Sequence, residues 1–172
     1  MQLNQEMETL SEKLSERATA AEAFCGLISE HETPRDGWLE ELYALLPRLH
    51  SAVTALKSHN VNDLPVTEID LDERFNLYSR LRKQLGERDS YWLEFDASPE
   101  QVNMSGSLAD DLTDIYFDLL HGLQLLDEAW PQRAAEVWQM TYRMHWGQHL
   151  VDAERHLYAL KVRNQLRVSQ GL

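Results

Sequence analysis

Three aspartates occur at helical spacing in the middle of the chain. Asp111, Asp114 and Asp118 are three and four residues apart, so at about 100° per residue they fall on one narrow ridge of a helix. Clustered carboxylates can hold a divalent cation. The spacing therefore makes this ridge a candidate metal site. The simpler interpretation is an acidic, solvent-exposed helix face close to the helix N-terminus, where the helix dipole favours negative charge.

Three histidines and one aspartate form a second ridge further along the chain. His145, His149, Asp152 and His156 are spaced by four, three and four residues, which places them within an arc of about 60° on one helix. Neutral imidazoles at positions i and i+4 can chelate zinc or another transition metal, and Asp152 could add a third ligand. A solvated polar helix face is again the simpler interpretation.

Complete catalytic motifs are missing. Trp146 follows His145, so the His-Glu-x-x-His pattern of zinc proteases, with its general base, does not occur. The sequence also has no Glu-x-x-His, which di-iron carboxylate bundles need twice, and no glycine-rich phosphate loop. We therefore expect no catalytic residue and no cofactor. The alternative is a divalent transition metal shared by the two ridges, for which imidazole and carboxylate together suit zinc, manganese or iron better than magnesium.

Apolar residues recur every three or four positions along most of the chain, which is typical of amphipathic helices. The predicted elements are a helix from Leu3 to Ile28, a helix from Trp38 to Leu56 kinked at Pro47, a helix capped by Asp70 and stopped by Gly86, a helix from Ser107 to about Asp127, and a helical stretch from Pro131 to about Val168, bent at Gly147. Alternation typical of strands is nearly absent. The sequence thus predicts a single all-α domain over residues 1–172, an antiparallel bundle of about five helices.

A helical bundle also predicts in which direction the polar residues should point. Each helix of a simple bundle turns its apolar face inward, so both ridges should point outward and should not meet. A shared site would need a central helix packed on both sides, or a second subunit. Two charged residues, Arg143 and Glu154, lie within an otherwise apolar arc and should find partners on neighbouring helices. Aromatic residues in the irregular segment 86–106, among them Tyr91, Trp92 and Phe95, should plug one end of the bundle.

Composition excludes several classes of protein. The chain has 16 Lys and Arg against 29 Asp and Glu, a net charge of -13, which would repel a phosphate backbone and argues against nucleic acid. No run of about 18 apolar residues suggests a membrane-spanning helix. The one cysteine, Cys25, is expected to be buried, and with no visible export signal we expect a cytoplasmic location. From Arg155 onward the charged residues are all basic, and this end should dock on the acidic remainder or on a second subunit.

Several segments resemble a bacterial family known as domain of unknown function 5063. They are Phe24-Cys25, Leu42–Leu49, Leu85–Tyr91, Ser107–Leu119 and His145–Arg155. The resemblance implies a small helical bundle of bacterial cytoplasmic proteins, and it supplies no activity and no functional residue.

Two functional hypotheses follow. The favoured one is a non-catalytic interaction module that uses its acidic face to bind a protein partner or to form a homo-oligomer. The alternative is a metal-binding bundle, and as such a metal-dependent hydrolase. Its candidate ligands are Asp111, Asp114, Asp118, His145, His149, Asp152 and His156.

Overall fold

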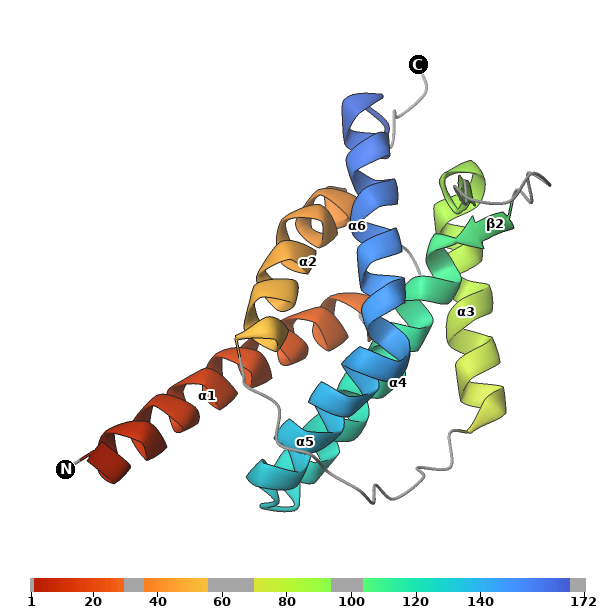
Figure 1. Cartoon of the computed structure of the whole chain (residues 1–172). Coiled ribbons are helices and arrows are strands. Elements are labelled where there is room, and N and C mark those ends of the chain that lie inside the picture. Colours follow the sequence, from red (N-terminus) through yellow and green to blue (C-terminus); the bar gives the residue numbers. More distant parts are fainter. Residues whose placement is uncertain (1, 30–35, 56–69, 94–103, 168–172) are drawn as a thin grey trace, which may run out of the picture.

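The structure is a computed structural model, which describes residues 2–29, 36–55, 70–93 and 104–167. Its helices are α1 (Gln2–Ser29), α2 (Trp38–Thr54), α3 (Leu71–Leu85), α4 (Leu108–Asp127), α5 (Pro131–Thr141) and α6 (Gly147–Val162) (Figure 1). A π-helical turn, η2 (Tyr142–Trp146), joins α5 to α6, and a short 3₁₀ turn, η1 (Gly86–Arg88), follows α3. The strands β1 (Ser90–Leu93) and β2 (Met104–Ser107) pair antiparallel. The prediction of an all-α bundle is confirmed.

Local signals explain where the helices begin and end. The carboxylate of Asp70 accepts hydrogen bonds from the backbone N–H groups of Asp72 and Glu73, so it caps α3 as predicted. Pro47 lies inside α2, which continues through it as one helix. The last helix is shorter than predicted, because it ends at Val162 and Asn164 then adopts a left-handed φ of 56°.

The predicted bend near Gly147 takes the form of the π-helical turn just before it. A Cβ at Gly147 would lie 2.3 Å from the carbonyl oxygen of Tyr142, so the turn requires a glycine at this position. Single π-helical turns of this kind occur often at functional sites. Here the turn carries His145, one of the predicted metal ligands.

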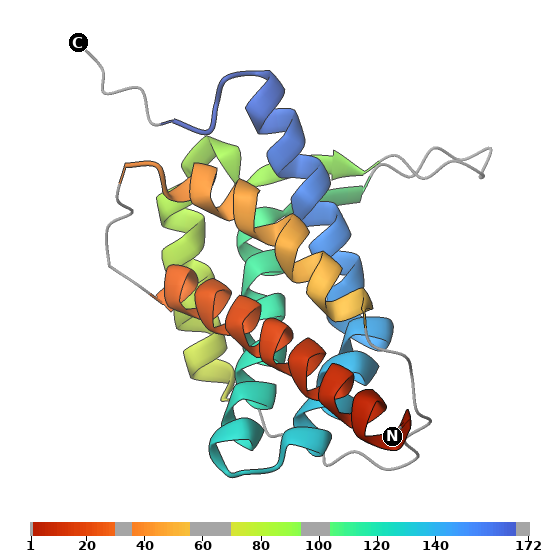
Figure 2. The same ribbon diagram turned by 90° about the vertical axis from the view of Figure 1, so that its left-hand side faces the viewer.

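Helix α4 is the central helix of the bundle, because α1, α3, α5 and α6 all pack against it. Figure 2 shows α1 and α2 side by side as an outer layer in front of α3 and α4. The leucine side of α4, with Leu112 and Leu119, has no exposed surface, and Thr113 and Asp114 on other sides of the same helix are buried as well. A helix that is covered on several sides cannot turn its polar ridge to solvent.

A buried arginine ties α1 to the end of α2. Arg17 has no exposed surface, and its guanidinium donates to the carbonyl oxygens of Val53, at 2.5 Å, and Ala52, at 3.4 Å. These carbonyls belong to the last turn of α2, where helix geometry leaves them without a backbone donor. The positive charge also faces the negative end of the helix dipole.

The structure also tests the predicted positions of Cys25 and of the aromatic residues in segment 86–106. Cys25 is buried, as expected. The prediction that aromatic residues plug one end of the bundle is right for Tyr91, which is buried, and wrong for Trp92, which is 70% exposed. Phe95 lies outside the described residues. Within the described part of the chain, no helix is long and apolar enough to cross a membrane.

Candidate metal centre

Helix α4 and the continuous η2–α6 segment bring the aspartate and histidine ridges face to face. Nδ1 of His149 lies 2.8 Å from Asp111, and Nδ1 of His145 lies 2.6 Å from Asp118. The prediction that the two ridges point outward and do not meet is therefore wrong. The physical reason is the central position of α4, which uses one side for the core and another for contact with α6.

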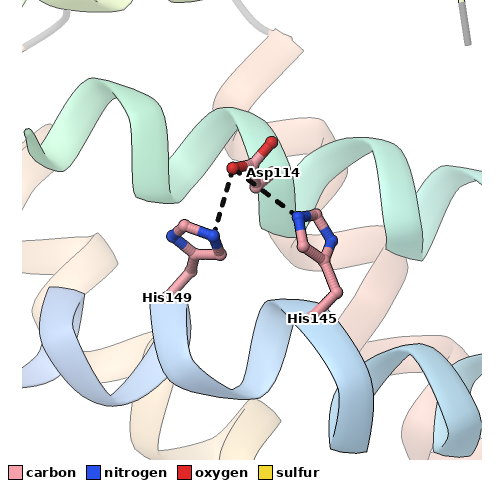
Figure 3. A group of neighbouring side chains, drawn as sticks. All are labelled: Asp114, His145 and His149. Carbon is pink, nitrogen blue, oxygen red and sulfur yellow. Dashed lines mark ion pairs between the residues drawn. The ribbon is translucent and has the colours of Figure 1, made fainter.

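Asp114 lies at the centre of the arrangement (Figure 3). Its Oδ2 atom is 3.2 Å from Nε2 of His149 and 3.9 Å from Nε2 of His145. One ligand atom from each of these three residues lies within 4.8 Å of the others. Asp114 is buried, His149 is half-buried and His145 is exposed, so the cluster opens to solvent on the His145 side.

Each histidine is oriented by its own carboxylate. Nδ1–H of His149 donates to Oδ1 of Asp111, and Nδ1–H of His145 donates to Oδ2 of Asp118. These hydrogen bonds turn both Nε2 atoms toward Asp114. A carboxylate that holds Nδ1 of a metal-binding histidine in this way fixes the tautomer and the ring orientation.

Arg74 on α3 holds the other side of Asp114. Its guanidinium makes a very short bond to Oδ1 of Asp114 and reaches Asp110 at 3.4 Å. Oδ1 is thus occupied, while Oδ2 faces the two imidazoles. Arg74 has no sign in the sequence pattern, because its role depends on the burial of Asp114, and a buried carboxylate needs a cationic partner.

Tyr91 on β1 holds the far end of the cluster. Its hydroxyl donates to Oδ2 of Asp111 at 2.5 Å, and its ring stacks on His156 with centroids 4.6 Å apart. Gly106 on β2 makes room for the ring, since a Cβ there would lie 2.3 Å from it. The sequence predicted that Tyr91 fills one end of the bundle, and its pattern does not connect Tyr91 with the site.

The remaining two predicted ligands lie outside the cluster. The carboxylate of Asp152 accepts a hydrogen bond from Gln148 at 2.9 Å. Nε2 of His156 donates to the backbone carbonyl of Arg88 at 2.7 Å, and burial lowers the pKa of this histidine. Of the seven candidate ligands, the structure thus gathers Asp111, Asp114, Asp118, His145 and His149 in one place.

The electrostatics of the cluster favour an added cation. Burial raises the pKa of Asp111, although the hydrogen bonds from His149 and Tyr91 oppose this effect, and burial likewise raises the pKa of Asp118. The hydrogen bond to Asp111 raises the pKa of His149. Arg74 supplies one positive charge for three aspartates. The excess of carboxylates is reduced where burial favours the neutral carboxyl form of Asp111 or Asp118, or is offset by a bound cation.

Comparison with known proteins identifies the family. The chain belongs to the family described as Domain of unknown function (DUF5063), whose model matches residues 8–163. A crystal structure of protein BF1032 from Bacteroides fragilis has the same fold, with a TM-score of 0.70 and 21% sequence identity over 88% of this chain and 94% of that chain. No curated protein is significantly similar to the chain.

Proposed function

We propose that this protein binds a divalent transition metal ion between α4 and the η2–α6 segment, with Asp114, His145 and His149 as ligands. The observation that carries the proposal is the approach of both Nε2 atoms to one oxygen, at 3.2 and 3.9 Å. Zinc lies about 2.0–2.2 Å from nitrogen and oxygen ligands, so neighbouring ligand atoms in a tetrahedral site are about 3.4 Å apart. The two oxygen–nitrogen distances are within about 0.5 Å of that spacing, and the three ligand atoms lie within 4.8 Å of one another.

The surrounding residues support a metal site. A histidine that binds a metal through Nε2 almost always donates its Nδ1–H to a carboxylate, a carbonyl or water. Both histidines have a carboxylate in this role, Asp111 for His149 and Asp118 for His145. Arg74 holds Oδ1 of Asp114 and so favours monodentate coordination through Oδ2. The support for all three ligands is thus already in place.

The ligand set also indicates which ions fit. Two imidazoles and one carboxylate suit zinc, manganese, iron or cobalt, whereas magnesium prefers oxygen ligands and water. Three protein ligands leave at least one coordination position open, as in catalytic rather than structural zinc sites. His145 has a side chain that is 48% exposed, so a water molecule or a small substrate could reach that position. A metal-dependent hydrolase is therefore the class of activity to test first.

The α4 ridge does not supply the acidic face of the interaction module that the sequence favours, and the module itself stays a prediction. Asp111 and Asp114 are buried, at 4% and 6% exposure, and cannot serve as an exposed acidic surface. A purely structural role for the cluster is the competing explanation. In that case the cluster is a network of ion pairs and hydrogen bonds that holds α4 and α6 together.

Metal analysis of purified variants distinguishes the two explanations. Protein produced without a histidine tag and dialysed against Zn²⁺ should retain one equivalent. Asp114→Asn and His149→Gln should lose it, because each removes a ligand. His156→Gln is the matched control, since His156 lies on the same helix and bonds to a backbone carbonyl, and this variant should retain the metal. Equal retention by all three variants, or no retention by the natural sequence, would leave the ion-pair network as the better account.

A further inference from the structure

A stripe of exposed apolar side chains runs along the outer side of the η2–α6 segment. Met144, Val151, Tyr158 and Val162 are 76%, 44%, 62% and 63% exposed. The separations of seven and four residues place Val151, Tyr158 and Val162 within an arc of about 40° on α6. Met144 lies seven residues before Val151, in the π-helical turn η2. Such spacing is typical of a seam that packs against another helix. We call these four residues the α6 stripe.

The charges around the α6 stripe are of one sign. All exposed charged residues between 143 and 167 are basic, namely Arg143, Arg155, Lys161, Arg163 and Arg167. Arg155 lies about 20° beyond one edge of that arc, with its guanidinium over the ring of Tyr91, and the ammonium of Lys161, on the α2 side of α6, faces the ring of Tyr43. The whole chain carries a net charge of -13. The α6 stripe is thus apolar and basic on a strongly acidic molecule, and it fits an acidic surface.

The same chain has a groove of the complementary kind between α1 and α2. The groove has a volume of about 530 Å³ and is lined by Glu22, Ala23, Gly26, Leu27, Glu41, Ala44, Leu45 and Arg48. Small residues leave it open, and a Cβ added at Gly26 would meet no atom within 4 Å. The exposed charged residues of α1 in the range 11–29 are all acidic, namely Glu12, Glu16 and Glu22. The groove therefore offers small apolar side chains and the carboxylates of Glu22 and Glu41 beside one guanidinium, Arg48. With the exposed Glu12 and Glu16 on α1, its surroundings carry a net negative charge.

We propose that two copies of this chain form a dimer in which the α6 stripe of each copy docks in the α1–α2 groove of the other. Charge complementarity selects a second copy, because the basic stripe and the acidic groove occur on the same chain. Helix α2 packs against both α1 and α6 and lies between them in Figure 2, so the α1–α2 groove is separated from the helix that carries the stripe by α2 alone. A two-fold axis beside α2 can then form both contacts at once and close the assembly. Neither surface contains a proposed metal ligand.

The test uses light scattering after gel filtration, at about 1 to 100 μM protein, a range that brackets micromolar affinity. The natural chain should have the mass of two copies. A stripe-reversed variant, Arg155→Glu with Lys161→Glu, should be monomeric, and so should a groove-reversed variant, Glu16→Lys with Glu22→Lys. An equimolar mixture of these two variants should form dimers again, because each docking contact in the mixed pair joins opposite charges. Lys83→Glu, on the exposed surface of α3, is the control and should remain dimeric.

Circular dichroism of each variant checks that the fold is retained, as expected for exposed positions. A natural chain that is monomeric over the whole range would overturn the proposal. A dimer that the reversed variants leave intact would overturn it as well. Loss of the dimer in the stripe-reversed variant alone would indicate that two stripes pair with each other, which contradicts docking in the groove. Each result is independent of whether the chain binds metal.

Discussion

The imidazole of His149 lies 2.8 Å from the carboxylate of Asp111, a contact that links α6 to α4 across 38 residues of sequence. Asp111 in turn accepts the hydroxyl of Tyr91, and His149 faces Asp114 through its other nitrogen. One buried carboxylate therefore connects the β1–β2 pair with the proposed metal ligands.

The phenol of Tyr91 should contribute measurably to stability. In Tyr91→Phe the carboxylate of Asp111 loses a buried hydrogen-bond donor, so the free energy of unfolding should fall by about 1–3 kcal/mol. Urea denaturation measures this change. Tyr158→Phe is the matched control, because Tyr158 is 62% exposed and its change should stay within about 0.5 kcal/mol. Equal effects of the two substitutions would show that the Tyr91 hydroxyl contributes nothing.

Arg17 should be required for the packing of α1 on α2. In Arg17→Met the side chain keeps most of its apolar length, but the carbonyls of Val53 and Ala52 lose their donor inside the protein. The guanidinium is costly to bury, because burial lowers the pKa of Arg17 to about 10. The methionine variant avoids this desolvation cost, which offsets part of the loss. We expect a net loss of about 1–3 kcal/mol in urea denaturation. The exposed Lys83→Met serves as control, and an unchanged midpoint for Arg17→Met would contradict the capping role.

The thiol of Cys25 should be inert in the folded protein. Burial raises the pKa of Cys25 from 9.0 to about 12, so the nucleophilic thiolate is scarce at pH 8.5. Because the pKa of Cys25 is higher in the folded than in the unfolded protein, the neutral buried thiol contributes to stability. This contribution is complete below about pH 9 and is lost as the pH rises from about 9 to about 12. Iodoacetamide labelling followed by mass spectrometry checks the prediction. Rapid labelling without urea would show that Cys25 is accessible.

Local sequence features were sufficient to predict the start of α3 and the continuity of α2. Capping by Asp70 and the continuity of α2 through Pro47 depend on neighbouring residues, and both follow the prediction. The end of the last helix does not, because its left-handed residue is Asn164, which is a weaker stop signal than glycine.

The site was predictable in its residues and not in its geometry. Helical spacing correctly grouped Asp111, Asp114 and Asp118, as well as His145 and His149. Whether the two groups meet depends on how many helices surround α4, which is a property of the tertiary structure. Arg74 and Tyr91 join through long-range contacts that no local pattern indicates. Glu154 did find the neighbouring-helix partner that burial demands, His50 on α2 at 2.9 Å.

The most direct test of the proposed metal centre is calorimetric titration of the metal-stripped natural chain with Zn²⁺, and then with Mn²⁺ and Co²⁺. We expect saturable binding of one ion per chain, with a Kd below about 10 μM for at least Zn²⁺, equivalent to roughly 7 kcal/mol. Binding should disappear in a variant that combines His145→Gln with His149→Gln and persist in His156→Gln. No saturable binding below about 10 μM for any of the three ions would contradict the account, and the cluster would then be an ion-pair network between α4 and α6.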